Sequence, residues 1–195
     1  SNGTLHKELP LQKKPVRACY FFQDNQHFLT QSKTTVKLWN MDGQLIKELP
    51  VSSPKGIQMN QQGSHFVLWD AQNQLTLFDK KGTSQAILQG QEGVIIKAEF
   101  SPNDQYLLTT SKDGKALLWE TTGNLLANWN LQSFQPTPAF FSPTGDEVYI
   151  TEATTIQRYP MPQNVYQELL RDKKNIIEYL KGCSNYQIQF LDKME

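Results

Sequence analysis

The segment TTSKDGKALLWETTGN, residues 109–124, contains the signals of two successive β-hairpins. Its Lys-Asp-Gly sequence at 112–114 predicts a tight turn, because an Asp side chain bonds its own backbone and a Gly tolerates a positive φ. The apolar run 116–119, which ends in a Trp, predicts a strand, and Thr-Gly at 122–123 predicts a second turn. Two hairpins in succession form a meander, which cannot bury its faces alone. The segment therefore requires neighbours of the same kind.

The same pattern occurs three more times along the chain. An aromatic residue ends the apolar strand in each copy, at Trp39, Phe78, Trp119 and Tyr159. These positions are about forty residues apart, and two further apolar segments joined by a polar turn precede each of them. A period near forty with four short strands per unit is typical of β-propeller blades. The sequence therefore predicts an all-β fold of about four antiparallel, four-stranded blades.

The repeat places the expected boundaries of the blades. Residues 4–10 are assigned as an isolated outer strand, because their sequence TLHKELP resembles QLIKELP at 44–50. The propeller part is expected to cover residues 4–160, with repeats at about 11–50, 51–89, 90–130 and 131–160. In the first repeat the strands are expected near 17–22, 27–32, 35–40 and 45–49.

A different pattern follows the repeats. Prolines at 160 and 162 end the repeat region, because proline can continue neither a strand ladder nor a helix. Apolar residues at intervals of three and four within 163–181 predict an amphipathic helix, and the alternation at 186–190 predicts a half-buried strand. Residues 163–195 are therefore expected to form a tail packed on the propeller. The helix is interpreted as a lid in preference to a partner helix or a membrane-surface helix, since its polar face carries charges of both signs.

Composition limits the classes of partner. Among 195 residues, Lys+Arg and Asp+Glu both count 19, so the net charge is zero and no nucleic-acid partner is predicted. No run reaches the length of a membrane span, and no membrane association is predicted. Cys19 and Cys183 have no disulfide-framework spacing, which favours a cytoplasmic location. Because the chain starts without Met and with an outer strand, it is expected to be a fragment of a larger multidomain protein.

Four short segments of the third repeat resemble a WD repeat: EFSPN at 99–103, LLT at 107–109, DG at 113–114 and LWE at 118–120. In that family an Asp, a Thr or Ser, a Trp and the His of a Gly-His pair form a structural hydrogen-bond network. Thr109, Asp113 and Trp119 match this pattern, whereas the Gly-His position falls on Gly90-Gln91, so the network is expected to be incomplete. The Asp position falls on Lys33 in the first unit and on Gln72 in the second.

The resemblance implies structural roles for the residues of this network and for the matching aromatic residues. These structural residues are Thr109, Asp113, Trp119, Trp39, Phe78 and Tyr159. Asp113 and Thr109 could be drawn as part of a catalytic set, but the turn explains Asp113 fully. His27 and His65 occupy the same repeat position, which predicts surface residues and not a metal site. No catalytic residue, cofactor or metal is predicted.

The layout resembles bacterial regulators of the signal-transduction ATPase type, which end in a propeller followed by a helical tail. The resemblance implies a non-catalytic scaffold or sensor that binds protein partners. The alternative is a propeller enzyme whose funnel site is built partly by further blades. That alternative requires several carboxylates or histidines at the inner ends of different blades. The inner strands offer single residues instead: Arg17, Cys19, Gln58, Lys97 and Glu99.

Closure of the ring has three predicted solutions. A four-bladed ring could be closed by residues 4–10, two chains could join into an eight-bladed ring, or a longer polypeptide could supply further blades. The two-chain ring is favoured, because it completes the strand count without straining the blades. Residues 186–190 are the competing source for the missing outer strand of the fourth repeat.

Overall fold

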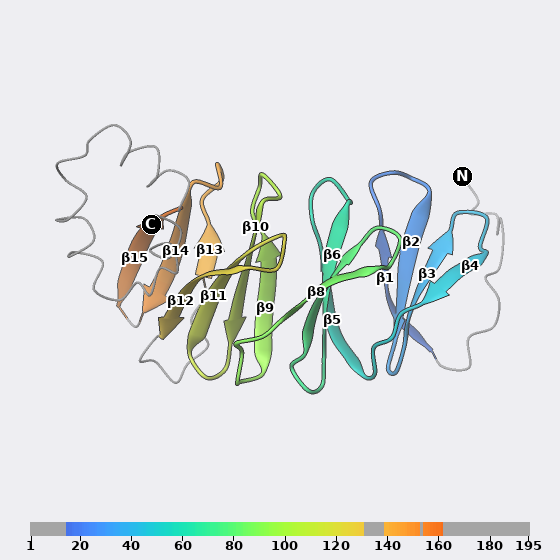
Figure 1. Cartoon of the computed structure of the whole chain (residues 1–195), viewed down its shortest axis with the longest axis horizontal. Helices are drawn as coiled ribbons and strands as arrows, with labels where there is room; N and C mark the ends of the chain where they lie inside the picture. The colour runs from blue at the N-terminus through green and yellow to red at the C-terminus, as the bar shows by residue number, and fades with distance from the viewer. Residues whose placement is uncertain (1–14, 131–138, 153, 162–195) are drawn as a thin grey trace, which may run out of the picture. The chain divides into compact units, whose positions relative to one another are not determined.

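Fifteen strands form four antiparallel sheets in the computed structural model, which describes residues 15–130, 139–152 and 154–161 (Figure 1). Blade 1 contains β1 (Val16–Phe21), β2 (His27–Ser32), β3 (Val36–Asn40) and β4 (Leu45–Glu48). Blade 2 contains β5 (Pro54–Met59), β6 (His65–Asp70), β7 (Leu75–Asp79) and β8 (Ser84–Leu88). Blade 3 contains β9 (Ile95–Phe100), β10 (Tyr106–Ser111), β11 (Lys115–Glu120) and β12 (Leu125–Asn130). Blade 4 contains β13 (Ala139–Phe141), β14 (Glu147–Glu152) and β15 (Thr155–Pro160).

The predicted all-β class is confirmed for this part of the chain, which contains no helix. The strands of blade 1 begin and end within one residue of the expected positions. The predicted outer strand at 4–10 and the predicted tail at 163–195 lie outside the described residues. None of the described segments is a helix long and apolar enough to cross a membrane.

Two backbone hydrogen bonds recur in every blade and define the repeat. The first closes the turn between the first two strands, as in Phe22 N–H to His27 O at 3.1 Å. Its equivalents are donated by Asn60, Ser101 and Ser142. The second ties the end of the third strand to the same turn and is donated by Met41, Lys80, Thr121 and Met161. The repeat therefore continues through Met161, and blade 4 keeps both of these hydrogen bonds.

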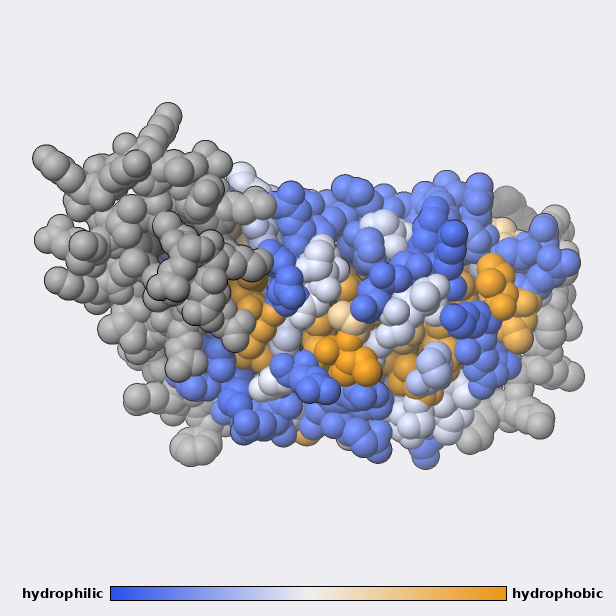
Figure 2. All heavy atoms as spheres, in the orientation of Figure 1, coloured by the Kyte–Doolittle hydropathy of each residue, from blue (hydrophilic) through white to orange (hydrophobic). Residues whose placement is uncertain are grey.

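The second strand of each complete blade lies in the middle of the buried layer. All six residues of β10 are buried, and so are five of the six residues of β2. A strand with both faces covered loses the polar alternation of a half-exposed strand. The fourth strands are more exposed: β4 is exposed along its length, and Figure 2 shows hydrophobic side chains at the surface over it, where Leu45 and Ile46 lie. The apolar runs of the sequence thus correspond to inner strands that are packed on both faces of a blade.

The chain divides into two compact units, Ser1–Gln85 and Ala86–Glu195, with the boundary inside β8. In unit 1 the core lies between blades 1 and 2, where Phe66 stacks on Phe78 at 5.2 Å and meets Phe22 edge-on at 5.9 Å. In unit 2 the core lies between blades 3 and 4, where the Trp129 and Tyr159 rings are 5.3 Å apart. Each unit therefore buries one blade-to-blade interface of aromatic and aliphatic side chains.

Candidate functional site

The network predicted in the third repeat is centred on the hydroxyl of Thr109 in β10. Trp119 Nε1 donates to Thr109 Oγ1 at 2.9 Å, and both side chains are buried. The side-chain amide of Gln91 also donates to this oxygen, which in turn donates to Leu117 O at 3.4 Å. A hydroxyl that accepts twice and donates once uses its full hydrogen-bonding capacity. The amide of Gln91 therefore reaches Thr109 from the position where the family has a histidine.

Asp113 holds a different contact from the one that the family pattern implies. Its Oδ2 accepts from Gly93 N–H at 3.0 Å and from Glu92 N–H at 3.3 Å, and its Oδ1 accepts from the hydroxyl of Ser111. These bonds join the β10–β11 turn to the loop that leads into β9. A Cβ added at Gly93 would lie 2.6 Å from Asp113 N, so this close approach requires glycine. Asp113 is thus placed as a clamp between a turn and a loop.

These contacts make the clamp depend on the charge of Asp113. Burial raises the pKa of this carboxyl, but the hydrogen bonds from Ser111 and Gly93 outweigh burial and hold the pKa below its usual 3.8. A lowered folded-state pKa stabilises the fold above the unfolded pKa, and this stabilisation is lost as pH falls through the folded value. We therefore expect Asp113→Asn to be less stable than the wild type at pH 7, with a difference that shrinks below pH 3.8.

Urea unfolding from pH 7 down to the acid limit of the fold measures this difference. Asp104→Asn is the matched control, because Asp104 lies in the neighbouring β9–β10 turn and its substitution leaves the Asp113 clamp intact. A difference between wild type and Asp113→Asn that stays constant or grows on acidification would contradict the role of the charge.

The aromatic residues of the four blades divide into two kinds of pair. Trp39 Nε1 donates to Thr30 Oγ1 at 2.9 Å, so blade 1 repeats the Trp119–Thr109 bond of blade 3. Thr30 and Thr109 each lie two residues beyond the residue that faces the Trp across the ladder.

In the other two blades this position is apolar. Leu68 takes it in blade 2, where the aromatic is Phe78, and Ile150 takes it in blade 4, where the aromatic is Tyr159. A buried indole N–H requires an acceptor, whereas a phenyl ring does not. Thr30 was not predicted from the sequence. The signal was present, because a Thr accompanies the Trp in blades 1 and 3 and an apolar residue accompanies the other aromatic residues.

The turn between the second and third strands is capped differently in the first two blades. Lys33 and Gln72 occupy the expected Asp positions, but neither side chain caps the turn. In blade 2, Asp70 Oδ1 accepts from the N–H groups of Gln72 and Gln74, both at 2.9 Å. In blade 1 the hydroxyl of Ser32 accepts two backbone N–H groups of the turn. The capping residue thus moves to the strand end when the turn position lacks an acid.

The histidines lie beside the turns of their own blades. His27 Nδ1 is 2.8 Å from Asp24 Oδ2, and His65 Nδ1 is 3.0 Å from Ser64 Oγ. Both are half-buried, so they are less exposed than the surface position predicted for them. No three His, Cys, Asp or Glu groups of the described segments are grouped to hold a metal ion. The third histidine, His6, lies outside the described residues.

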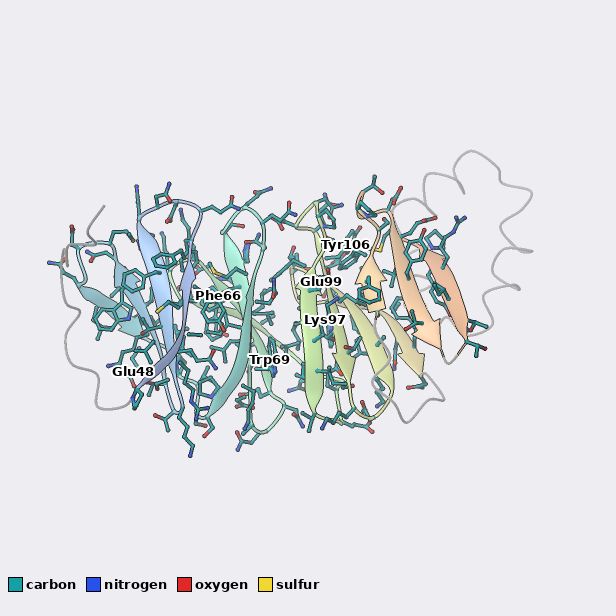
Figure 3. All side chains as sticks on the ribbon, turned by 180° about the vertical axis from the view of Figure 1, so that it is seen from behind. Glu48, Phe66, Trp69, Lys97, Glu99 and Tyr106 are labelled. Atoms are coloured by element: carbon teal, nitrogen blue, oxygen red, sulfur yellow. The ribbon has the colours of Figure 1, made fainter. Side chains whose placement is uncertain are left out.

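The first strands carry the residues considered for a funnel site. Arg17 and Cys19 lie on β1, and Gln58 lies on β5. Lys97 and Glu99 lie side by side on β9, as Figure 3 shows, with Nζ to Oε2 at 2.7 Å.

Lys97 also connects blade 3 to blade 4. Its Nζ donates to Ala139 O at 3.2 Å and lies 4.4 Å from the centroid of the Phe140 ring. Phe140 is exposed, and so is Ile96, the residue before Lys97 in β9. We name Ile96, Lys97, Glu99 and Phe140 the first-strand surface.

Comparison with known proteins identifies the kind of repeat. Residues 82–120 match the family model WD domain, G-beta repeat. This match covers the Thr109–Asp113–Trp119 network and supports the WD-repeat propeller architecture predicted from the sequence. A solved structure, the computationally designed Ika4 protein, matches with a TM-score of 0.63 at 17% identity, covering 82% of this chain and 99% of that chain. At this identity the likeness shows the fold alone.

Two curated relatives also match part of the chain. The chain is 29% identical over 107 residues to Cilia- and flagella-associated protein 52 of Mus musculus, across 52% of this chain. It is 30% identical over 82 residues to the tRNA (guanine-N(7)-)-methyltransferase non-catalytic subunit wdr4 of Dictyostelium discoideum, across 40% of this chain. The match covers only 17% of the length of either relative. Both relatives are eukaryotic, in contrast to the bacterial regulators that the layout resembles.

Proposed function

We propose that the chain is a non-catalytic protein-interaction module that serves as a scaffold or sensor. The observation that carries the proposal is the first-strand surface of unit 2. Its ammonium group at Lys97 is held by Glu99 and a backbone carbonyl, and it lies over the exposed aromatic ring of Phe140. Exposed aromatic rings are enriched in protein interfaces relative to the rest of the surface.

The hydrogen-bonding groups elsewhere in blade 3 support the same proposal. Thr109 and Trp119 bond each other, and Asp113 bonds a turn and a loop, so these groups hold the blade together. The WD repeat is widely used for protein–protein assembly, and the residues of this network serve the blade and not a reaction. We also propose that the scaffold acts in signal transduction, which is the setting that the propeller and the expected helical tail imply.

A photo-crosslinking amino acid at position 96 tests the proposal. We expect it to crosslink a discrete protein from the source cell, and excess unlabelled wild-type chain should compete for that product. The double variant Lys97→Glu/Phe140→Ala should fail to compete at the same concentration, because the fixed charge and the ring are both lost.

Position 46 provides the matched control, because Ile46 is an exposed isoleucine on β4, away from the first strand of its blade. Circular dichroism of the double variant verifies that the sheets remain folded. Equal crosslinking from positions 96 and 46, or full competition by the folded double variant, would contradict the proposal.

A further inference from the structure

The sheet of blade 4 has three strands among the described residues, whereas each of the other sheets has four. In the complete blades the fourth-strand segment contributes a buried apolar side chain. These side chains are Leu49, Leu88 and Trp129. In blade 1 this residue also bonds the third strand, with Leu49 N–H donating to Val36 O at 2.9 Å. Within the part of the chain that the structure describes, blade 4 is thus one strand shorter than the repeat that it otherwise follows.

The side chain of Ile156 on β15 is uncovered, unlike its counterparts in the complete blades. It lies three residues before the strand-end aromatic, as do Val36, Leu75 and Ala116 in the complete blades. Those three side chains are 0% exposed, whereas the Ile156 side chain is 69% exposed. An isoleucine at a position that is otherwise wholly buried indicates a surface made to be covered.

The sequence contains a segment that matches the absent strand. Residues 4–10, TLHKELP, share five of seven residues with QLIKELP at 44–50, which contains β4. In this alignment Leu9 corresponds to Leu49, the buried residue of the blade 1 fourth strand. The same alignment places Glu8 opposite Gln157, as Glu48 lies opposite Lys37.

The connection to β1 limits which blade can contain this strand. Residues 9–15 join the segment to β1, and the corresponding connections between blades are residues 49–53, 89–94 and 131–138. Since these connections have similar lengths, a strand at 4–10 belongs to the blade directly beside blade 1. A blade 4 that receives the strand is therefore a neighbour of a blade 1.

Contacts within each unit show that neighbouring blades diverge little. In unit 1 the first-strand turns touch, since a Cβ on Gly63 would lie 2.9 Å from Gln23 N. The fourth-strand edges touch as well, because Lys47 Nζ donates to Gly82 O at 2.9 Å.

In unit 2 the first strands touch, because Lys97 of β9 bonds the carbonyl of Ala139 in β13. Trp129 of the fourth strand β12 contacts Tyr159 of the third strand β15. A four-bladed ring has to turn by about 90° at each step, which separates the fourth-strand edges, whereas an eight-bladed ring turns by about 45°. Blade pairs in contact at both edges favour the larger ring.

We infer that residues 4–10 of one chain pair with β15 of a second copy, and that the second copy returns the same strand. The exchange is isologous, so two chains related by a two-fold axis complete both fourth blades. A large exposed ring on a terminal blade fits this assembly, since Phe21 of β1 is 64% exposed. The occupant of the β15 surface is thus a strand of this sequence supplied by another chain.

Disulfide trapping between two single-cysteine chains tests the source of the strand. In a Cys19→Ser/Cys183→Ser background, one chain carries Glu8→Cys and the other carries Gln157→Cys. We expect the mixture, refolded together and oxidised, to give a disulfide-linked dimer on a non-reducing gel, and neither chain alone to do so. Lys37→Cys/Glu48→Cys in one chain is the matched positive control, because these residues are register partners in blade 1. Light scattering should give twice the monomer mass for the wild type and the monomer mass after deletion of residues 1–10.

Other outcomes identify other occupants and overturn the inference. A chain carrying both Glu8→Cys and Gln157→Cys that closes only an internal disulfide would show that the strand comes from its own chain. Trapping of Gln157→Cys by Gln187→Cys in place of Glu8→Cys would assign the strand to residues 186–190. A wild-type chain that remains monomeric at micromolar concentration, with the control disulfide formed, would also overturn it.

Discussion

Trp119→Ala is expected to lower the free energy of unfolding by about 3–5 kcal/mol, because it removes a fully packed ring from a buried site. The ring is 2% exposed and its Nε1 is bonded to a hydroxyl that is itself 0% exposed. Chemical denaturation, followed by the fluorescence of the remaining Trp residues, measures the loss. An unfolding midpoint equal to that of the wild type would refute the structural role of this residue.

Blade 2 provides the matched control for the hydrogen bond. Phe78 and Leu68 occupy the two positions held by Trp119 and Thr109 in blade 3. Thr109→Leu alone leaves a buried indole N–H without its acceptor and should cost about 1–3 kcal/mol. Adding Trp119→Phe removes that N–H, so the double variant should be more stable than additive losses predict. Strictly additive losses would show that the two residues are energetically independent.

Gly82→Val is expected to destabilise the fold by about 2–4 kcal/mol, since a branched side chain at a positive φ adds to a steric clash. Gly82 has a φ of 72°, and a Cβ there would lie 2.8 Å from Leu49 Cδ2. Leu49 is buried, so its side chain cannot move into solvent without loss of its own packing. Thermal and urea unfolding of the variant measure the combined effect.

Leu49→Ala separates the clash from the backbone strain. If the clash contributes, Gly82→Val should cost less in the Leu49→Ala background than in the wild type, because the added methyl groups gain space. Gly82→Asn is a second control, since Asn tolerates a positive φ better than Val does. Equal costs of Gly82→Val in both backgrounds would assign the whole effect to the backbone.

The positions of the strands could be predicted because their signals are local. Turn residues such as Gly114 and Gly145 adopt a positive φ, and the runs between the turns have the length of a strand. These preferences act within a few residues, so they appear in the sequence without knowledge of partners. The period then fixed the number of blades, because each copy carries the same local signals.

The hydrogen-bonding partners were harder to predict, because they depend on segments far apart in the chain. Gln91 is eighteen residues from Thr109, and Lys97 reaches a carbonyl forty-two residues away. The turn of blade 2 is capped by Asp70 at the strand end, two residues before the Gln72 position that aligns with Asp113, because the direction of a side chain at a strand end depends on register. A shift of one residue reverses the face on which a side chain lies, and sequence spacing does not resolve such a shift.

The sequence by itself determined the all-β class, the period and the aromatic residue that ends each third strand, because alternation and turn chemistry are properties of short segments. Only the tertiary structure decided which groups meet across the blades. It paired Trp39 with Thr30, made Asp113 a clamp on the loop before β9, and left Ile156 exposed where its counterparts are buried. The physical reason is that burial and hydrogen bonding between blades depend on the packing of whole sheets, which no single segment contains.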